Sequence, residues 1–226
     1  KTSALFHTDA VQAYGKIPLV PLMKDLDLMT VSGHKVHGPK GTGALYVKTG
    51  LHIDPFIWGG GQERGFRSGT ENMPGIVGFG VAAQLVREEE ESRIARLREV
   101  RARLLSGLCQ EIPDILINSP QAALGEETAQ EAACCPSILN VSFLGCPGEV
   151  MLHSLEQKEV YVSTGSACSS KKKGSHVLTA AGLPPEAVGS AVRFSFSEDN
   201  TIEQMDYVVD EVKKTAEKIR KTTRRA

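Results

Sequence analysis

Several things are scarce in this sequence, and each scarcity excludes a class of protein. No run of about 18 or more apolar residues is present, so no segment is predicted to cross a membrane. The net charge of −1 gives no excess of basic residues, which disfavours direct nucleic-acid binding. The five cysteines are an odd number and include no C-x-x-C pair, and no signal-peptide pattern precedes them. A disulfide framework is therefore not expected, and a reducing, cytoplasmic compartment is.

The 226 residues suffice for one large domain or two modest ones with a buried core. The apolar share of 41% and the charged share of 23% are ordinary for a soluble globular protein. Short apolar runs alternate with helical periodicity, which predicts an α/β fold. The expected strands are 4–6, 28–31, 43–47, 115–118, 139–143 and 192–197, and the expected helices are 74–91, 93–111, 147–158 and one that Thr201 caps and that ends near Thr223.

The pattern changes part-way along the chain, which predicts two domains. Residues 1–90 are interpreted as part of a larger α/β domain, and residues 91–226 as a smaller α+β domain. The charge runs Glu88–Glu91 and Lys171–Lys173 are interpreted as solvated faces, and no internal repeat is visible.

Lys35 and Asp9 both follow strand-like runs. The carboxyl ends of strands are where α/β sheets bind ligands. A pyridoxal phosphate (PLP) enzyme needs such a pair, because an amine must react with the aldehyde and a carboxylate must keep the ring nitrogen protonated. A lone loop lysine is usually only a solvated residue. The nearby Ser32 and His34, which can donate hydrogen bonds to a phosphate, favour the site over that alternative.

Two further stretches are candidates for holding an anion or a metal. Arg67-Ser68-Gly69-Thr70 combines a hydroxyl with glycine-opened backbone amides before a predicted helix, which suits a phosphate. The glycine-rich stretch 38–43 lacks the order of a nucleotide-binding P-loop. His34 and His37 have the spacing of a metal pair, but no acidic or thiol partner is near them in sequence, so no metal site is predicted.

Cys168 and Arg193 are the candidates in the second half. Cys168 lies in the small, polar run Ser163-Thr164-Gly165-Ser166-Ala167-Cys168-Ser169-Ser170. A structural cysteine normally sits in an apolar run, so a reactive thiol is favoured here, and the lysines at 171–173 would favour its thiolate. Arg193 is a cation inside an alternating strand. It is either a plain edge-strand arginine or a fork that binds a substrate carboxylate through two N–H groups.

Together these segments resemble the cysteine desulfurases of the NifS/IscS group, which are fold-type I PLP enzymes related to class V aminotransferases. The resemblance covers essentially the whole chain and implies a mostly parallel sheet with helices in the larger domain. It rests on His7-x-Asp9-Ala10-Val11-Gln12-Ala13, Ser32-Gly33-His34-Lys35, Gly38-Pro39-Lys40-Gly41-x-Gly43-Ala44-Leu45-Tyr46-Val47, Gly59-Gly60-Gly61-Gln62-Glu63-Arg64, Arg67-Ser68-Gly69-Thr70, Gly165-Ser166-Ala167-Cys168 and Val192-Arg193-Phe194-Ser195.

The resemblance implies how a PLP cofactor is held. Lys35 would form the covalent bond to the aldehyde and act as the catalytic base. Asp9 would pair with the pyridinium nitrogen, and Gln12 would donate to the phenolic oxygen. Ser32 and His34 would hold the phosphate.

It also implies the substrate and the partners. Arg193 would bind the carboxylate of L-cysteine, and Cys168 would take the sulfur as a persulfide for an acceptor such as an iron–sulfur scaffold protein. Thr70 would reach the phosphate of the other subunit of a homodimer.

Enzymes of this group are considerably longer, and this chain resembles their C-terminal portion only. An upstream N-terminal half of the same enzyme is therefore an expected partner. Two alternatives remain open: a selenocysteine lyase or other PLP β-lyase of the same fold, and a non-catalytic fragment that lacks half of the cofactor pocket.

Overall fold

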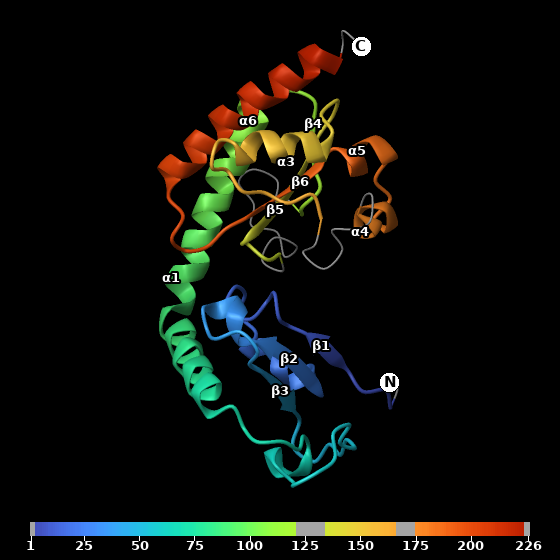
Figure 1. Ribbon diagram of the computed structural model, residues 1–226, viewed down its shortest axis with the longest axis vertical. Helices are drawn as coiled ribbons and strands as arrows, with labels where there is room; N and C mark the ends of the chain where they lie inside the picture. Colours follow the sequence, from blue (N-terminus) through green and yellow to red (C-terminus); the bar gives the residue numbers. More distant parts are fainter. Residues whose placement is uncertain (1–2, 121–133, 166–174, 224–226) are drawn as a thin grey trace. The chain divides into compact units, whose positions relative to one another are not determined.

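The computed structural model describes residues 3–120, 134–165 and 175–223. The chain divides into two compact units, Lys1–Arg93 and Ile94–Ala226, and each is described by itself (Figure 1). The division lies close to the predicted boundary after residue 90. The assignment of the units to a cofactor-binding domain and a small domain stays a prediction.

The first unit contains a three-stranded sheet in the order β1–β2–β3 (Figure 1). β1 (His7–Asp9) pairs with β2 (Leu28–Ser32) in parallel, and β2 pairs with β3 (Gly43–Val47) in antiparallel fashion. Three short 3-10 turns accompany the sheet: η1 (Val20–Asp25), η2 (Gly33–Val36) and η3 (Glu63–Gly65).

The predicted first strand at 4–6 is wrong, because the ladder begins only at His7. Leu5 and Phe6 form an apolar run, but their side chains are 55% and 56% exposed. Apolar character was therefore not the signal for the strand. The backbone pairing with β2 decides its position.

The two faces of this sheet differ in chemistry. Side chains alternate between the faces of a strand, and directly opposite residues of paired strands share a face. Met29 and Val31 point to the buried side and pack with Ala10 and Leu26. The opposite face carries the polar residues His7, Asp9, Thr30 and Ser32 beside the apolar Leu28 at the start of β2 and Leu45 and Val47 of β3.

One helix, α1 (Met73–Glu111), stands where two helices were predicted, so the expected break near residue 92 is wrong. No proline or glycine lies between residues 81 and 106, and an ion pair of 3.5 Å between Glu89 and Arg93 spans the expected junction. Within the first unit, residues of α1 such as Val86 and Phe79 pack near Tyr14 and Val36.

The second unit contains an antiparallel sheet in the order β4–β5–β6 (Figure 1). Its strands are β4 (Ile115–Ile117), β5 (Ile138–Phe143) and β6 (Ala191–Ser195), within two residues of the predicted ranges at each end. Its helices besides α1, within the described residues, are α3 (Gly148–Glu156), α4 (His176–Ala180), α5 (Pro185–Gly189) and α6 (Ile202–Thr223), and α3 packs against α6.

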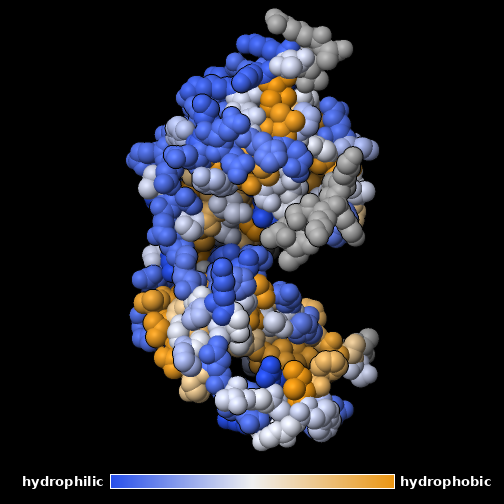
Figure 2. Space-filling model, viewed as in Figure 1, coloured by the Kyte–Doolittle hydropathy of each residue, from blue (hydrophilic) through white to orange (hydrophobic). Residues whose placement is uncertain are grey.

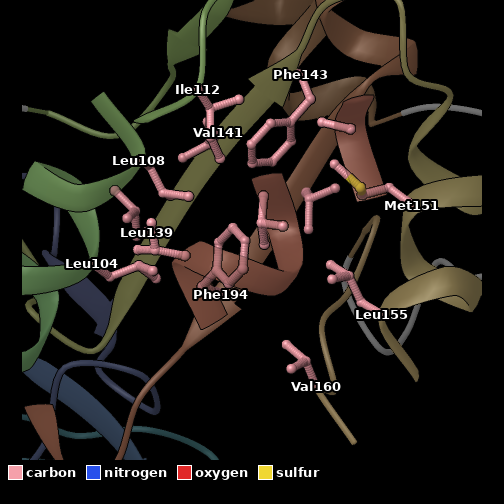
Figure 3. Close-up of a cluster of buried hydrophobic side chains, with 14 of the residues drawn as sticks. Leu104, Leu108, Ile112, Leu139, Val141, Phe143, Met151, Leu155, Val160 and Phe194 are labelled. Carbon is pink, nitrogen blue, oxygen red and sulfur yellow. The ribbon is translucent and has the colours of Figure 1, made fainter. Parts of the chain in front are cut away.

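A single large apolar cluster fills this second unit (Figure 3). Alternate residues of β5, namely Leu139, Val141 and Phe143, point into this cluster and are fully buried. The second half of α1, the helices α3 and α6, and β6 close it from other sides. Its large, fully buried members include Leu104, Leu108, Leu139, Val141, Phe143, Met151, Leu155, Val192 and Val212.

Helix α6 begins with the predicted reciprocal cap. The Gln204 amide donates to Thr201 Oγ1 at 3.2 Å, and the Thr201 amide donates to Gln204 Oε1 at 3.1 Å. Each bond satisfies a backbone N–H that the helix leaves without a partner. Among the described residues, no helix combines the length and apolar character needed to cross a bilayer.

Candidate cofactor and substrate site

The parallel pairing of β1 and β2 brings the first candidates to one edge of the sheet. Asp9 ends β1 and lies opposite Thr30. Ser32 ends β2 two residues later, and the turn η2 with His34 and Lys35 follows at once. The structure thus places a carboxylate, a hydroxyl, an imidazole and an amine after the carboxyl ends of two neighbouring strands.

Asp9 presents an exposed carboxylate. Its Oδ1 accepts a hydrogen bond of 2.9 Å from the Val11 amide, the only hydrogen bond to this carboxylate within the described residues. The Ala10 amide donates to the Thr30 carbonyl at 2.9 Å, which ties the turn after β1 to β2. One carboxylate oxygen therefore remains available to a cationic N–H group.

The turn that carries Lys35 is held by its backbone. The Gly33 amide donates to the Thr42 carbonyl, and the Gly38 amide donates to the Gly33 carbonyl, both at 2.9 Å. A Cβ at Gly38 would lie 2.9 Å from that Gly33 oxygen, so glycine is required there. The side chain of Lys35 is half-buried, and its ammonium has no hydrogen-bond partner in the described part of the chain.

Ser32 and His34 contact each other across this turn. Ser32 Oγ lies 2.8 Å from His34 Nδ1. The pair leaves His34 Nε2 exposed, and an N–H there can donate to an anion. His37, the other member of the metal pair considered from the sequence, ends the turn with a left-handed φ of 65°. Among the described residues, no group of three His, Cys, Asp or Glu side chains is placed to hold a metal ion.

Gln12 and Thr70 lie outside the turn that carries Lys35. Gln12 is exposed, and its Oε1 accepts a hydrogen bond of 3.2 Å from Lys16 Nζ. Thr70 is exposed as well. Two amides of the predicted anion loop already donate to residues before the loop, because Ser68 N donates to the Ile57 carbonyl at 3.2 Å and Gly69 N donates to Gln62 Oε1 at 3.0 Å. The role of Thr70 as a phosphate contact stays a prediction.

Arg193 belongs to the second unit, on β6. It lies opposite Asn140 of β5, whereas its neighbours Val192 and Phe194 point into the core. Arg193 and Asn140 therefore share the polar face of this sheet. Arg193 Nε is buried and has no hydrogen-bond partner among the described residues. An unsatisfied guanidinium N–H is costly, and an anionic ligand would satisfy it.

Cys168 lies outside the described residues. Two other cysteines differ in their exposure. Cys109 is a free and exposed thiol. Cys146 is buried, and its burial raises the pKa of the thiol despite the nearby Arg220 guanidinium. A raised pKa disfavours the nucleophilic thiolate, so Cys146 is a structural residue.

Sequence reasoning missed His7 and Thr30. His7 Nε2 lies 2.8 Å from Thr30 Oγ1, on the same sheet face as Asp9. The alternation of His7 and Asp9 along β1 was a signal for this polar face. The expected strand at 4–6 hid it, because His7 and Asp9 were then loop residues.

Comparison with known protein families identifies the class of protein to which this fold and these polar strand ends belong. The aminotransferase class-V family profile matches residues 1–208. The chain belongs to this family. The predicted resemblance and the predicted α/β class are thereby confirmed.

Curated relatives show which members of this family the chain is similar to. The chain is 44% identical over 211 residues to a protein named cysteine desulfurase from Gluconacetobacter diazotrophicus, and 43% identical over 216 residues to cysteine desulfurase IscS from Methanosarcina thermophila. These matches cover 93% and 95% of this chain but 50% and 51% of the relatives. The chain thus spans about half the length of the curated relatives it matches.

Solved structures agree. A NifS-like protein superposes with a TM-score of 0.78 at 36% identity, covering 93% of this chain and 52% of that one. A NifS-like protein from Rickettsia africae superposes with a TM-score of 0.80 at 30% identity, covering 95% and 54%. The chain therefore has the fold of part of a NifS-like, fold-type I enzyme.

Proposed function

We propose that this chain is the C-terminal portion of a PLP-dependent cysteine desulfurase, which removes sulfur from L-cysteine and leaves alanine. The carrying observation is the parallel pairing of β1 and β2, which puts Asp9 and the Lys35 turn at the same edge of one sheet. The names of the curated relatives point to the same reaction.

The residues at this edge fit PLP in their donor chemistry. Lys35 supplies an amine without a hydrogen-bond partner among the described residues, which suits an aldehyde. Asp9 supplies a carboxylate with an available oxygen, which suits a protonated ring nitrogen. Ser32 and His34 supply donors for a phosphate, and Gln12 an amide for the phenolic oxygen. PLP, when bound, would supply the capacity to take up and return the electron pair at the substrate Cα.

Three residues of the chain would then act on the substrate. Lys35 Nζ would move the proton at the substrate Cα. Arg193 would hold the substrate carboxylate through its buried, unsatisfied N–H group. The Cys168 thiolate would form a bond to the substrate sulfur as the carbon–sulfur bond breaks, which gives a persulfide for transfer to an acceptor protein, such as an iron–sulfur scaffold.

The first unit supports a partner as well. Exposed apolar side chains follow one another along the first half of α1, where Figure 2 shows hydrophobic surface. Ile76, Val77, Val81 and Leu85 are 42–59% exposed. A surface of this kind marks an interface. We assign it to the upstream half of the enzyme together with a second subunit, to which Thr70 would contribute a phosphate contact. A cytoplasmic location would keep Cys168 reduced.

Lys35 is tested by adding PLP to the protein. We expect an absorbance band near about 400 nm and, after borohydride reduction, a PLP adduct on the peptide that carries Lys35. Lys35→Ala should remove both signals. Lys40→Ala is the matched control, because Lys40 is an exposed lysine five residues away. An unchanged adduct in Lys35→Ala would refute the assignment of the lysine. A colourless protein, alone and with the upstream half, would favour the non-catalytic alternative.

Cys168 is tested by persulfide labelling after addition of L-cysteine. Cys168→Ala should still bind PLP but form no persulfide. Cys109→Ala, which removes an exposed thiol, should behave as the unchanged protein. Normal sulfur transfer by Cys168→Ala would remove its role. Faster release of selenide from selenocysteine, independent of Cys168, would favour a selenocysteine lyase.

A further inference from the structure

Arg193 is held on both sides by backbone pairing. On one side it pairs with Asn140 of β5. On the other, the Arg193 amide donates to the Ser163 carbonyl at 2.6 Å, and the Ser163 amide donates to the Arg193 carbonyl at 3.1 Å. No hydrogen bond to the Arg193 guanidinium occurs among the described residues, and its Nε is buried without one. Within the described residues, the direction of the side chain therefore depends on the backbone at Ser163 and Asn140.

Ser163 is in turn fixed by the residue after it. Thr164 Oγ1 donates a hydrogen bond of 2.6 Å to Glu149 Oε1. Such a short bond to a carboxylate is stronger than one between neutral groups. Ser163 Oγ also donates to the Gly165 carbonyl at 2.7 Å, which closes the turn on itself.

Glu149 is well placed to act as an anchor. It lies in the first turn of α3, where the helix dipole favours a negative charge. The preceding Gly148 brings α3 close to the same segment, because a Cβ there would lie 3.3 Å from Thr164 Cγ2 and 3.0 Å from the Ala191 carbonyl oxygen. Glu149 thus joins α3 to the segment that pairs with β6.

We propose that Glu149 is a positioning residue. By accepting the hydrogen bond of the Thr164 hydroxyl, it holds Ser163 in its bridge to Arg193 and so sets the direction of the Arg193 guanidinium. The bridge itself is independent of any reaction. Its consequence for substrate binding rests on the proposed function, in which Arg193 holds the substrate carboxylate.

The bridge is tested by amide hydrogen exchange at Ser163 and Arg193, resolved by residue. Glu149→Ala and Thr164→Val should each speed exchange at these two amides by about three- to tenfold, the worth of one lost hydrogen bond. Thr164→Ser and Glu149→Gln keep a donor and an acceptor and should stay close to the unchanged protein. Glu156→Gln is the matched control, because it removes a carboxylate from the same helix that contacts His153 instead.

In the double variant Glu149→Ala/Thr164→Val, the amides of Ser163 and Arg193 should exchange no faster than in either single variant, because both substitutions remove the same hydrogen bond. Wild-type exchange at Ser163 and Arg193 in the folded single variants would overturn the proposal, and so would additive effects in the double variant.

Kinetics of the assembled enzyme give the second readout. Glu149→Ala should raise KM for L-cysteine by about three- to tenfold with kcat within about twofold, because uniform binding of the carboxylate is lost. Thr164→Ser should restore KM. An unchanged KM in Glu149→Ala would overturn the positioning role. If the unchanged enzyme shows no turnover of L-cysteine, the proposed function fails, and the exchange measurement still decides whether Glu149 holds the bridge.

Discussion

The two units of this protein bury apolar surface very differently. The second unit packs its large side chains into one cluster, with Leu104, Phe143 and Met151 fully buried. The first unit has two small clusters. It also carries thirteen of the eighteen large apolar side chains that are exposed within the described residues.

This difference indicates that the second unit holds its own fold, whereas the first needs a covering surface. Trp58 and Phe56 of the first unit are 77% and 98% exposed, and residues of this size contribute little until they are buried. The chain spans about half the length of its curated relatives, and under the proposed function the upstream half of the enzyme would supply that surface.

Matched phenylalanine substitutions give the largest expected contrast. Phe143→Ala should lower the free energy of unfolding of the second unit by about 3–5 kcal/mol, because it leaves a cavity in the core and removes an edge contact with Phe194. Phe56→Ala in the first unit should change stability by less than about 0.5 kcal/mol. Denaturant titration followed by amide exchange in each unit measures both. Equal losses would contradict the comparison.

Two glycines of α1 allow the packing of the two units to be compared on a single helix. A Cβ at Gly107, in the second unit, would lie 2.6 Å from Cγ2 of the buried Val209, so Gly107→Ala should destabilise by about 1–3 kcal/mol. A Cβ at Gly80, in the first unit, meets nothing within 4 Å, so Gly80→Ala should stabilise by about 0.5–1 kcal/mol through helix propensity. Thermal unfolding of the two variants should move in opposite directions.

The cap of α6 should contribute less than the core it supports. Thr201→Ala removes the acceptor for the Gln204 amide and should cost about 1 kcal/mol. Thr201→Ser keeps that acceptor and should cost little. Denaturant midpoints compare them, and a Thr201→Ser loss as large as that of Thr201→Ala would show that the hydroxyl is not responsible.

Substitution of Asp27 is expected to have the smallest effect on stability, and this effect depends on pH. The Phe6 amide, which donates to its carboxylate at 2.9 Å, and then Lys48 at 3.2 Å hold the pKa of Asp27 below its ordinary value of 3.8. A carboxylate with a lowered pKa stabilises the folded state when the pH lies above its ordinary pKa. This stability is lost as the pH falls through the pKa of the folded state.

Asp27→Asn should therefore destabilise the first unit at neutral pH, and the gap to the unchanged protein should close between about pH 5 and pH 2. Amide exchange in β1 and β2 across this range measures it. Asp25→Asn, at an exposed neighbouring carboxylate, is the control. A gap that persists at the acid end would assign the effect to something other than the carboxylate charge.

Much of the fold was readable in the sequence because local signals were strong. β3 was predicted at its observed bounds, and the reciprocal cap at Thr201 was predicted with its partner Gln204. The first strand was misplaced because Leu5 and Phe6 are apolar without being buried. The two helices predicted at 74–91 and 93–111 are one helix, and the ion pair between Glu89 and Arg93 spans their expected junction.

Residue identities by themselves determined the chemistry proposed for this protein: a lysine and an aspartate after strand-like runs, a cysteine in a polar run and an arginine in a strand. Only the tertiary structure decided which of these groups share a face. Register and strand direction set that, since a parallel β1–β2 pair brings Asp9 to the edge where Ser32 and Lys35 follow. The bridge between Ser163 and Arg193, and the carboxylate of Glu149 behind it, join residues far apart in the chain, and no local pattern encodes such contacts.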